Sequence, residues 1–209
     1  VIVQKMAFVF RNGNGTIVGR DPNGNDIYYD VYPANAGLIA QFLAPETTQL
    51  ISSGDSLEFV IAATQKSDFK IYDNGTLVYQ DSTKQDNFYL GSTVGGIHTV
   101  VLQADYGTTT VYDTAYYAVQ GPLNVGVMPS GREQGINELN DTTVFFKLYA
   151  PFKNRVYCLT SLNDFLPDTI NAMTRTPGGA WWFLEMNVPA GQPVTYQYMI
   201  DGDLRVADP

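Results

Sequence analysis

The sequence is poor in cysteine, in positive charge and in long apolar runs, and each shortage argues against a class of protein. Cys158 is the only cysteine among 209 residues, so no disulfide can form within the chain and its stability must come from burial. Twelve Lys and Arg stand against 21 Asp and Glu, for a formal charge of -9. Because the cations are also unclustered, we expect binding to neither nucleic acid nor anionic lipid surfaces. No apolar run approaches the roughly 20 residues of a membrane helix, so no membrane span is predicted.

Groups that could carry catalysis are also scarce. His98 is the only histidine and lies among apolar residues in a predicted strand, where a structural role on the sheet face is expected. Cys158 has no second thiol or histidine near it in the sequence and is predicted to be a small core residue. A glycosidase needs two carboxylates about 5 to 10 Å apart across a cleft, whereas the acidic residues here are scattered through turns. The chain alone is therefore predicted to be non-catalytic and to use no cofactor.

Aromatic and turn residues are abundant instead, with 14 Tyr, 11 Phe and 19 Gly, a composition that favours strands joined by tight turns. Short strand patterns follow one another from residue 38 to residue 119, separated by turns such as Ser53-Gly54-Asp55 and Asp73-Asn74-Gly75. Roughly seven or eight short strands without a helical period are typical of an immunoglobulin-like (Ig-like) sandwich. Further strand patterns at 142–149, 155–160, 181–186 and 194–200 predict a second sandwich.

These patterns predict an all-β fold with two Ig-like or E-set sandwiches in tandem. Residues 1–32 hold three short strands, too few to close a core, and are interpreted as the tail of a preceding module. Residues 33–122 form the predicted Ig-like sandwich. Residues 123–209 form the second sandwich, and its first part, up to residue 140, is predicted to be a loop. Because Val1 is neither an initiator methionine nor the start of a signal peptide, we expect a processed product or an excised piece.

The most informative pattern lies at residues 181–202, interpreted as two antiparallel strands that are broken near Pro189 and end in an Asp201-Gly202 turn. Neighbouring strand residues point to opposite faces, so Trp181 and Trp182 cannot both lie in the core, and one is expected to face solvent or a partner domain. An outward ring can stack on the apolar face of a pyranose while flanking polar groups bind its hydroxyls. The candidate carbohydrate-binding residues are Trp181, Trp182, Phe165, Asn163, Tyr196, Gln197 and Tyr198.

One turn invites a metal interpretation. Residues 21–26, DPNGND, place oxygen-bearing side chains at alternate positions, as a calcium loop does. The EF-hand pattern fails, because Asp26 stands where glycine is required and Tyr32 stands where a bidentate glutamate is required. A turn with Asx capping is the better interpretation, and no metal site is predicted.

Two resemblances to known families rest on specific motifs. Gly54-Asp55-Ser56-Leu57, the hairpin at 71–77 and the strand that begins Gly95-Gly96-Ile97-His98 resemble bacterial Ig-like modules of surface proteins and carbohydrate enzymes, which are chiefly spacers. Other motifs, in the second sandwich, resemble the family 48 carbohydrate-binding (CBM48) and E-set modules. They are Gly135-Ile136-Asn137, Ser161-Leu162-Asn163-Asp164-Phe165, Gly179-Ala180-Trp181-Trp182, Tyr196-Gln197-Tyr198 and Asp201-Gly202. With both resemblances combined, the chain is similar to the region that precedes the catalytic barrel in secreted Bacteroidetes α-amylase-type enzymes of glycoside hydrolase family 13.

This resemblance implies a non-catalytic accessory region of a starch-degrading or other α-glucan-degrading enzyme. It would act as a spacer and structural companion with weak α-glucan binding, outside or on the surface of a bacterial cell, with a catalytic barrel following Pro209 as its partner. Glycogen-binding members of the family carry a Trp, a Lys and a second Trp where this chain has Phe165, Gln197 and Leu204, so the cation and the second platform are missing from the implied site. The alternative is a stand-alone glycan-binding or adhesion protein built of Ig-like modules.

Overall fold

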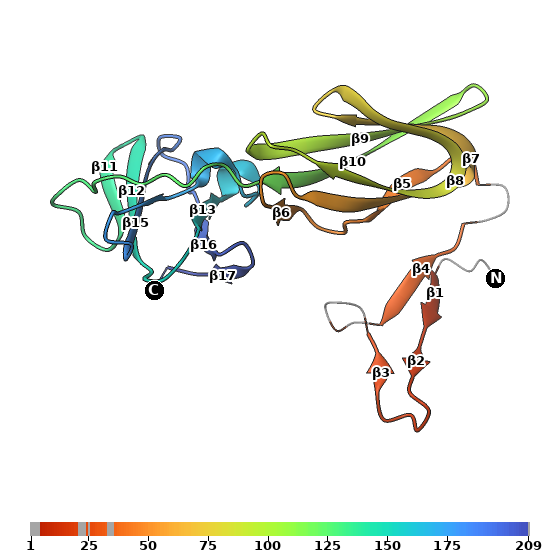
Figure 1. The fold of residues 1–209 in the computed structure, drawn as a ribbon, viewed down its shortest axis with the longest axis horizontal. Helices are drawn as coiled ribbons and strands as arrows, with labels where there is room; N and C mark the ends of the chain where they lie inside the picture. Colours follow the sequence, from red (N-terminus) through yellow and green to blue (C-terminus); the bar gives the residue numbers. More distant parts are fainter. Residues whose placement is uncertain (1–4, 21–23, 25, 33–35, 209) are drawn as a thin grey trace.

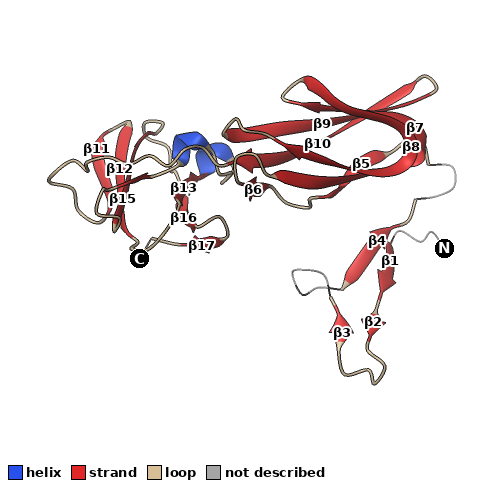
Figure 2. Ribbon diagram, viewed as in Figure 1, coloured by secondary structure: helices blue, strands red, loops and turns tan. Residues whose placement is uncertain are grey.

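The computed structural model describes residues 5–20, 24, 26–32 and 36–208, and its regular structure is almost entirely β-strand (Figure 2). The all-β fold class predicted from the sequence is confirmed. The helices among the described residues are two single turns of 3-10 helix, and none in this part of the chain is long and apolar enough to span a membrane.

The N-terminal strands form two small antiparallel ribbons. They are β1 (Lys5–Phe8) with β4 (Ile27–Asp30), and β2 (Phe10–Arg11) with β3 (Val18–Gly19). Apolar side chains remain exposed here, among them Met6, Phe10 and Ile17, so the side chains described in these ribbons do not form a buried core. Most of the predicted Asx turn at 21–26, and residues 33–35 of the predicted boundary, lie outside the described residues.

Six strands between residues 40 and 119 form the Ig-like sandwich (Figure 1). They are β5 (Ala40–Ala44), β6 (Gln49–Ile51), β7 (Ser56–Asp73), β8 (Thr76–Gly91), β9 (Gly96–Tyr106) and β10 (Thr109–Val119). The first half of β7 pairs with β5 and the end of β8, while its second half pairs with β9 and the start of β8. Beyond β9 come β10 and then β6, which runs parallel to β10.

Two of these strands are longer than the sequence predicts. Separate strands are expected at 56–64 and 67–72, but β7 runs through both, because an irregularity in its pairing with β8, between Ala62 and Ser67, absorbs the break in alternation. β8 likewise spans the predicted strands at 76–80 and 87–90. The turn between β7 and β8 is as predicted. Asn74 and Gly75 have φ of 47° and 81°, which a two-residue hairpin of this type requires.

Residues 135–206 form the C-terminal sandwich. Its elements are β11 (Gly135–Asn140), β12 (Thr143–Tyr149), β13 (Val156–Thr160), η1 (Ser161–Asn163), η2 (Thr169–Asn171), β14 (Thr174–Arg175), β15 (Trp181–Asn187), β16 (Tyr196–Ile200) and β17 (Leu204–Val206). One sheet has the order β11-β12-β15-β14 and the other the order β13-β16-β17. β11 lies in the segment predicted to be a loop; it pairs along β12 although every second residue, Ile136, Glu138 and Asn140, is exposed.

The two strands predicted in the stretch at 181–202 and the turn at Asp201-Gly202 are present, but the predicted antiparallel pairing of these strands with each other is wrong. β15 pairs with β12 and β14, whereas β16 pairs with β13 and β17. The connecting residues 188–195 include Pro189 and Pro193, and they cross from one sheet to the other instead of turning back. Trp182 of β15 and Tyr198 of β16 therefore face the same core from opposite sheets.

The two sandwiches lie end to end (Figure 1) and share a small apolar cluster, called here the joint. The joint consists of three buried residues of the C-terminal sandwich and three partly buried residues packed against them. They are Tyr157, Leu159 and Met199, with Leu50, Phe165 and Ala172. Leu50 belongs to β6 and the rest to the C-terminal sandwich, so the cluster links two otherwise separate cores.

Candidate functional site

β15 determines which tryptophan faces outward. Trp182 points into the core and is fully buried, and its indole Nε1 donates to the Ala150 carbonyl oxygen at 3.0 Å. Trp181 points to the opposite face and is half-buried. The prediction that alternation separates the two is confirmed. Tyr198 is fully buried as well, so Trp182 and Tyr198 have no surface to offer a sugar ring and are corrected from candidate binding residues to core residues.

Tyr196 has a packing role. Its ring lies edge-on to those of Phe146 and Tyr198, with centroid separations of 4.8 and 5.8 Å. Its hydroxyl donates to Asp208 Oδ2 at 2.6 Å. Burial, and then the interaction with Asp208, raises the pKa of Tyr196, so the phenol remains a hydrogen-bond donor that fastens the segment after β17 to the sandwich.

The remaining candidates lie at or beside the joint. Phe165 packs against the joint cluster. Gln197 is half-buried and stands opposite Leu159 in the pairing of β16 with β13. The side-chain amide of Asn163 donates to the Leu166 carbonyl oxygen at 2.9 Å. The outer face of β13 and β16, called here the joint face, is thus partly covered by β6, and these three candidates do not form an open platform together.

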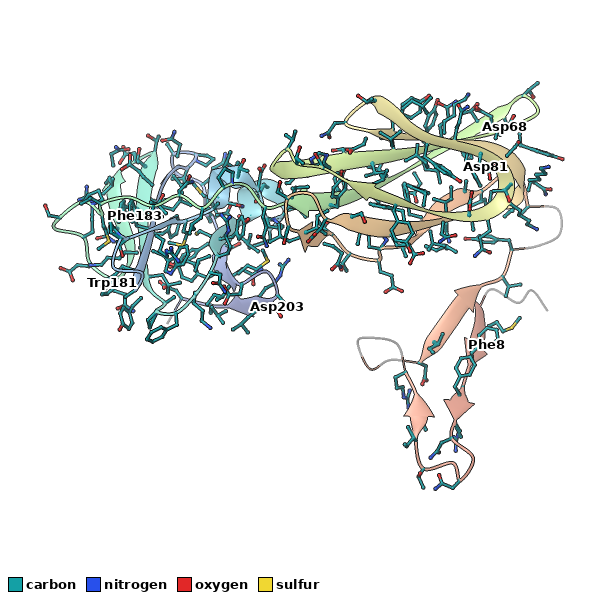
Figure 3. The ribbon with its side chains drawn as sticks, viewed as in Figure 1. Phe8, Asp68, Asp81, Trp181, Phe183 and Asp203 are labelled. Carbon is teal, nitrogen blue, oxygen red and sulfur yellow. The ribbon has the colours of Figure 1, made fainter. Side chains whose placement is uncertain are left out.

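The outer face of β12 and β15, called here the open face, carries a different set of side chains. Strand pairing places Tyr149 opposite Trp181 and Lys147 opposite Phe183. Because these strands alternate, the same residues face away from the core that contains Trp182 and Leu148. Figure 3 shows Trp181 and Phe183 on the half of the C-terminal sandwich remote from the Ig-like sandwich.

A strap formed by residues 124–132 covers part of the open face. The Gly126 amide donates to the Arg175 carbonyl oxygen at 3.0 Å, which attaches the strap to β14. The Arg132 guanidinium lies 5.5 Å from the centre of the Phe145 ring, and Lys147 Nζ donates to the Arg132 carbonyl oxygen at 2.7 Å. Phe145 is buried as a result.

At the edge of the strap, three side chains form a group called here the aromatic corner: Trp181 and Lys147, which are half-buried, and Tyr149, which is exposed. The rings of Trp181 and Tyr149 have centroids 4.9 Å apart and planes at 59° to each other. Lys147 Nζ lies 4.6 Å from the centre of the Trp181 ring. Tyr149 is 51% exposed, and Phe152, in the turn after β12, is 97% exposed.

Tyr149 and Lys147 were not among the residues predicted from the sequence. Their outward position could have been read from alternation, because Val144, Phe146 and Leu148 form an apolar series that leaves their neighbours on the other face. Their closeness to Trp181 depends on the register between β12 and β15, which alternation alone does not specify.

His98 and its partners form a buried polar network in the Ig-like sandwich. His98 Nδ1 lies 3.0 Å from Asp73 Oδ1, and the Tyr117 hydroxyl donates to Asp73 Oδ2 at 2.7 Å. His98 Nε2 lies 3.0 Å from the Val94 carbonyl oxygen, and its ring stacks on Tyr117 with centroids 4.6 Å apart. Both ring nitrogens are thus engaged by structural partners. The network fastens the start of β9 to the β7–β8 turn, in agreement with the structural role predicted for His98.

Cys158 lies in the core of the C-terminal sandwich with no exposed surface, as predicted. Burial raises the pKa of its thiol to about 12. The thiol therefore stays protonated at neutral pH, when nucleophilic attack or metal binding would need the thiolate. Within the described residues, no group of three or more His, Cys, Asp or Glu side chains is placed to hold a metal ion.

Two hollows in the surface lie away from the aromatic corner. One, of about 500 Å³, opens between β11 and the 188–195 connection, with Val144 and Phe146 at its floor. The other, of about 440 Å³, lies beside the joint and is lined by residues of both sandwiches, including Gln49 and Arg205. Neither contains a stacked aromatic platform.

No protein-family profile and no curated protein sequence matches the chain. Among solved structures, it is similar to a CARDB domain from Pyrococcus furiosus, at 16% identity and a TM-score of 0.32, over 39% of this chain and 93% of that one. The fibronectin(III)-like modules of Clostridium thermocellum CbhA are similar at 15% identity and a TM-score of 0.35, over 39% of this chain and 96% of that one. The Group B Streptococcus pullulanase SAP is similar at 11% identity and a TM-score of 0.31, and the match covers 83% of this chain but 23% of the pullulanase. These likenesses concern the fold.

Proposed function

We propose that the chain is a non-catalytic accessory region of an α-glucan-degrading enzyme of the α-amylase type, which serves as a rigid spacer and structural companion for a catalytic barrel. The motif resemblance supports this lineage. The observation that carries the spacer role is the joint, because it makes one continuous body of two sandwiches. The same proposal places the protein outside a bacterial cell or on its surface.

The joint leaves little room for hinge motion. A side chain at Gly121 would bring its Cβ to 2.9 Å from Thr169 Cγ2, and a Cβ at Gly95 would lie 2.7 Å from the Gly121 Cα. Leu50 packs into the joint cluster from β6, and the Gln120 amide donates to the Ile51 carbonyl oxygen at 2.9 Å, which fastens the start of the connection to the same strand. Contacts on both sides of the connection therefore resist bending of one sandwich against the other.

Distances between spin labels on the two sandwiches test the proposal. Cys158 is buried and will not take a label in the folded chain, so labels can be attached at Thr108→Cys, in the β9–β10 turn, and Val127→Cys, which is 86% exposed in the strap. We expect one narrow distance distribution, and a broad one after Leu50→Asp is added, because a carboxylate cannot remain in the apolar joint. A broad distribution without that third substitution would overturn the rigid-spacer role. Release of reducing sugar from soluble starch by the unlabelled chain would overturn the non-catalytic assignment.

A further inference from the structure

We propose that the aromatic corner is a binding site for a bent, α-linked gluco-oligosaccharide. It lies on the sheet opposite to the one that the sequence resemblance implies. The biological meaning of this site rests on the accessory role proposed above. Its existence rests on the geometry of Trp181, Tyr149 and Lys147.

The chemistry of the corner suits a neutral sugar. Pyranose rings present an apolar face that packs on an aromatic ring, and hydroxyl groups at the ring edge that need hydrogen-bond partners. Trp181 and Tyr149 supply two rings, and Lys147 Nζ is held 4.6 Å from the centre of the Trp181 ring. An ammonium has three donors, and one of those of Lys147 is taken by the Arg132 carbonyl oxygen. Because Lys147 Nζ lies over the Trp181 ring, it covers part of one face of that ring, and its other donors can reach the hydroxyls of a sugar that stacks beside it.

The angle between the two rings restricts the kind of chain. Two platforms in one plane would suit a flat ribbon such as a β-1,4-linked glucan. Here the ring planes meet at 59°, and the centroids are only 4.9 Å apart, so two sugars that stack on them must be inclined to each other. Successive residues of an α-1,4-linked glucan are inclined in this way, because that chain coils.

The corner is the right size for a few sugar rings and too small for a protein partner. An aromatic side chain buries about 150–250 Å² when fully covered, and Tyr149 retains about half of its surface. Even three fully exposed aromatic side chains would offer only about 450–750 Å², and Trp181 is half-buried, so the corner stays below the roughly 800 Å² per partner of a stable protein interface. The strap already covers the neighbouring Phe145, so the patch does not continue across the sheet.

The corner is also held in shape before a ligand arrives. Strand pairing fixes the backbones of Tyr149 and Trp181, the Ala150 amide donates to the Ala180 carbonyl oxygen at 2.9 Å, and the Thr176 amide donates to the Trp181 carbonyl oxygen at 2.9 Å. Lys147 is anchored through the strap. Little ordering remains to be done on binding, which favours affinity from a small contact area.

Titration of the full chain with maltoheptaose, by calorimetry and by tryptophan fluorescence, tests the proposal. We expect saturable binding with a Kd in the millimolar range or tighter, and a loss of about tenfold or more, equivalent to about 1.4 kcal/mol, in Trp181→Ala and in Tyr149→Ala. Tyr149→Phe keeps the ring and should retain affinity. The matched control is Gln197→Ala, which changes a half-buried polar residue of the joint face and should bind as the unaltered chain does.

Three outcomes would overturn the site: no saturable response of the unaltered chain at high maltoheptaose, equal binding by Trp181→Ala, or loss of binding in Gln197→Ala. Cellohexaose should bind at least about tenfold more weakly than maltoheptaose, and equal binding would overturn the assignment to a bent α-linked chain. Denaturant unfolding of each variant shows whether it is folded. A titration without saturable binding, combined with narrow spin-label distances, would overturn the sugar site and support the spacer role. Saturable binding combined with broad spin-label distances would support the sugar site and overturn the rigid-spacer role.

Discussion

The C-terminal sandwich uses its two outer faces differently. On the joint face, Tyr157, Leu159 and Met199 are buried, and Leu50 of the Ig-like sandwich packs against them. On the open face, the exposed Tyr149 and the half-buried Trp181 lie beside Lys147. The first face joins two cores, while the second carries the half-buried Trp181 and Lys147 and the exposed Tyr149.

The residues that the family resemblance implies for sugar binding and the residues of the aromatic corner lie on different sheets. The family resemblance directs attention to Phe165, Gln197 and Leu204, which flank the joint face. Apolar attachment to β6 occupies part of that face, and Leu204 is an exposed residue of β17 with no ring to offer. The aromatic and cationic groups that suit a sugar stand together on the other sheet. The sugar site proposed above therefore lies on the face that the second module leaves open.

The largest expected change in the free energy of unfolding comes from replacing Trp182, which lies in the core, and it can be compared with the change at its neighbour Trp181, which lies on the open face. Trp182→Ala should lower the free energy of unfolding by about 3–5 kcal/mol, because it leaves a cavity and an unpaired Ala150 carbonyl group. Trp181→Ala should cost about 1 kcal/mol, because that ring is half-buried on the open face. Urea unfolding measures both. Equal losses in the two variants would contradict the assignment of faces.

The next largest effect concerns the Cys158 thiol, which should make the stability of the C-terminal sandwich depend on pH. The pKa of Cys158 is raised to about 12 by burial, from an ordinary value of 9. Below pH 9 both the folded and the unfolded chain keep the proton; above it the unfolded chain releases the proton first, so stability falls as pH rises toward 12. At about pH 10.5 the loss should reach about 2 kcal/mol.

Cys158→Ala removes this contribution, so its stability should fall less steeply between about pH 8 and pH 10.5, by about 2 kcal/mol. Urea midpoints at the two pH values give the comparison. Tyr196 and Tyr198, whose pKa values are also raised by burial, keep some alkaline sensitivity in both chains. Parallel pH dependences of the two chains would show that the thiol does not titrate as its burial requires.

The smaller contribution of the joint is measured with a pair of leucines. Leu50→Ala should lower the free energy of unfolding by about 1 kcal/mol, less than the roughly 2–5 kcal/mol of a fully buried leucine, because Leu50 is half-buried in the joint. Leu204→Ala, at a leucine that is 52% exposed, is the control and should change stability by less than about 0.5 kcal/mol. If the two substitutions have the same effect, the joint does not stabilise the chain.

Local features of the fold could be predicted from the sequence where they depend on neighbouring residues. The Asn74-Gly75 hairpin follows from turn chemistry, and the opposite directions of Trp181 and Trp182 follow from alternation within one strand. The core position of Cys158 follows from its apolar surroundings. The two predicted strands that merge into β7 show the limit, because a polar interruption ends the alternation without ending the backbone pairing.

Features that depend on contacts between distant segments could not be predicted. The sheet to which β15 belongs is decided by its pairing with β12 across about thirty residues of chain, and the sequence at 188–195 fits a crossing as well as a turn. The covering of the joint face by Leu50 is a contact between two modules, which no local pattern encodes. The aromatic corner depends both on alternation within one strand and on the pairing of β12 with β15. Alternation alone indicated that Trp181 or Trp182 faces outward, whereas Tyr149 and Lys147 could be placed beside Trp181 only with the pairing known.

The smallest expected change in stability comes from replacing Phe152, in the turn after β12, and the same variant tests whether this ring takes part in sugar binding. Phe152 is 97% exposed and has a φ of 61°, a left-handed backbone conformation that costs a residue with a Cβ more than it costs glycine. Phe152→Gly should therefore stabilise the chain by about 0.5–1 kcal/mol in urea unfolding. Affinity for maltoheptaose in the same variant shows whether the ring extends the corner. Unchanged affinity limits the site to Trp181, Tyr149 and Lys147, whereas a drop alongside higher stability would mean that a strained backbone is kept because its side chain contacts the ligand.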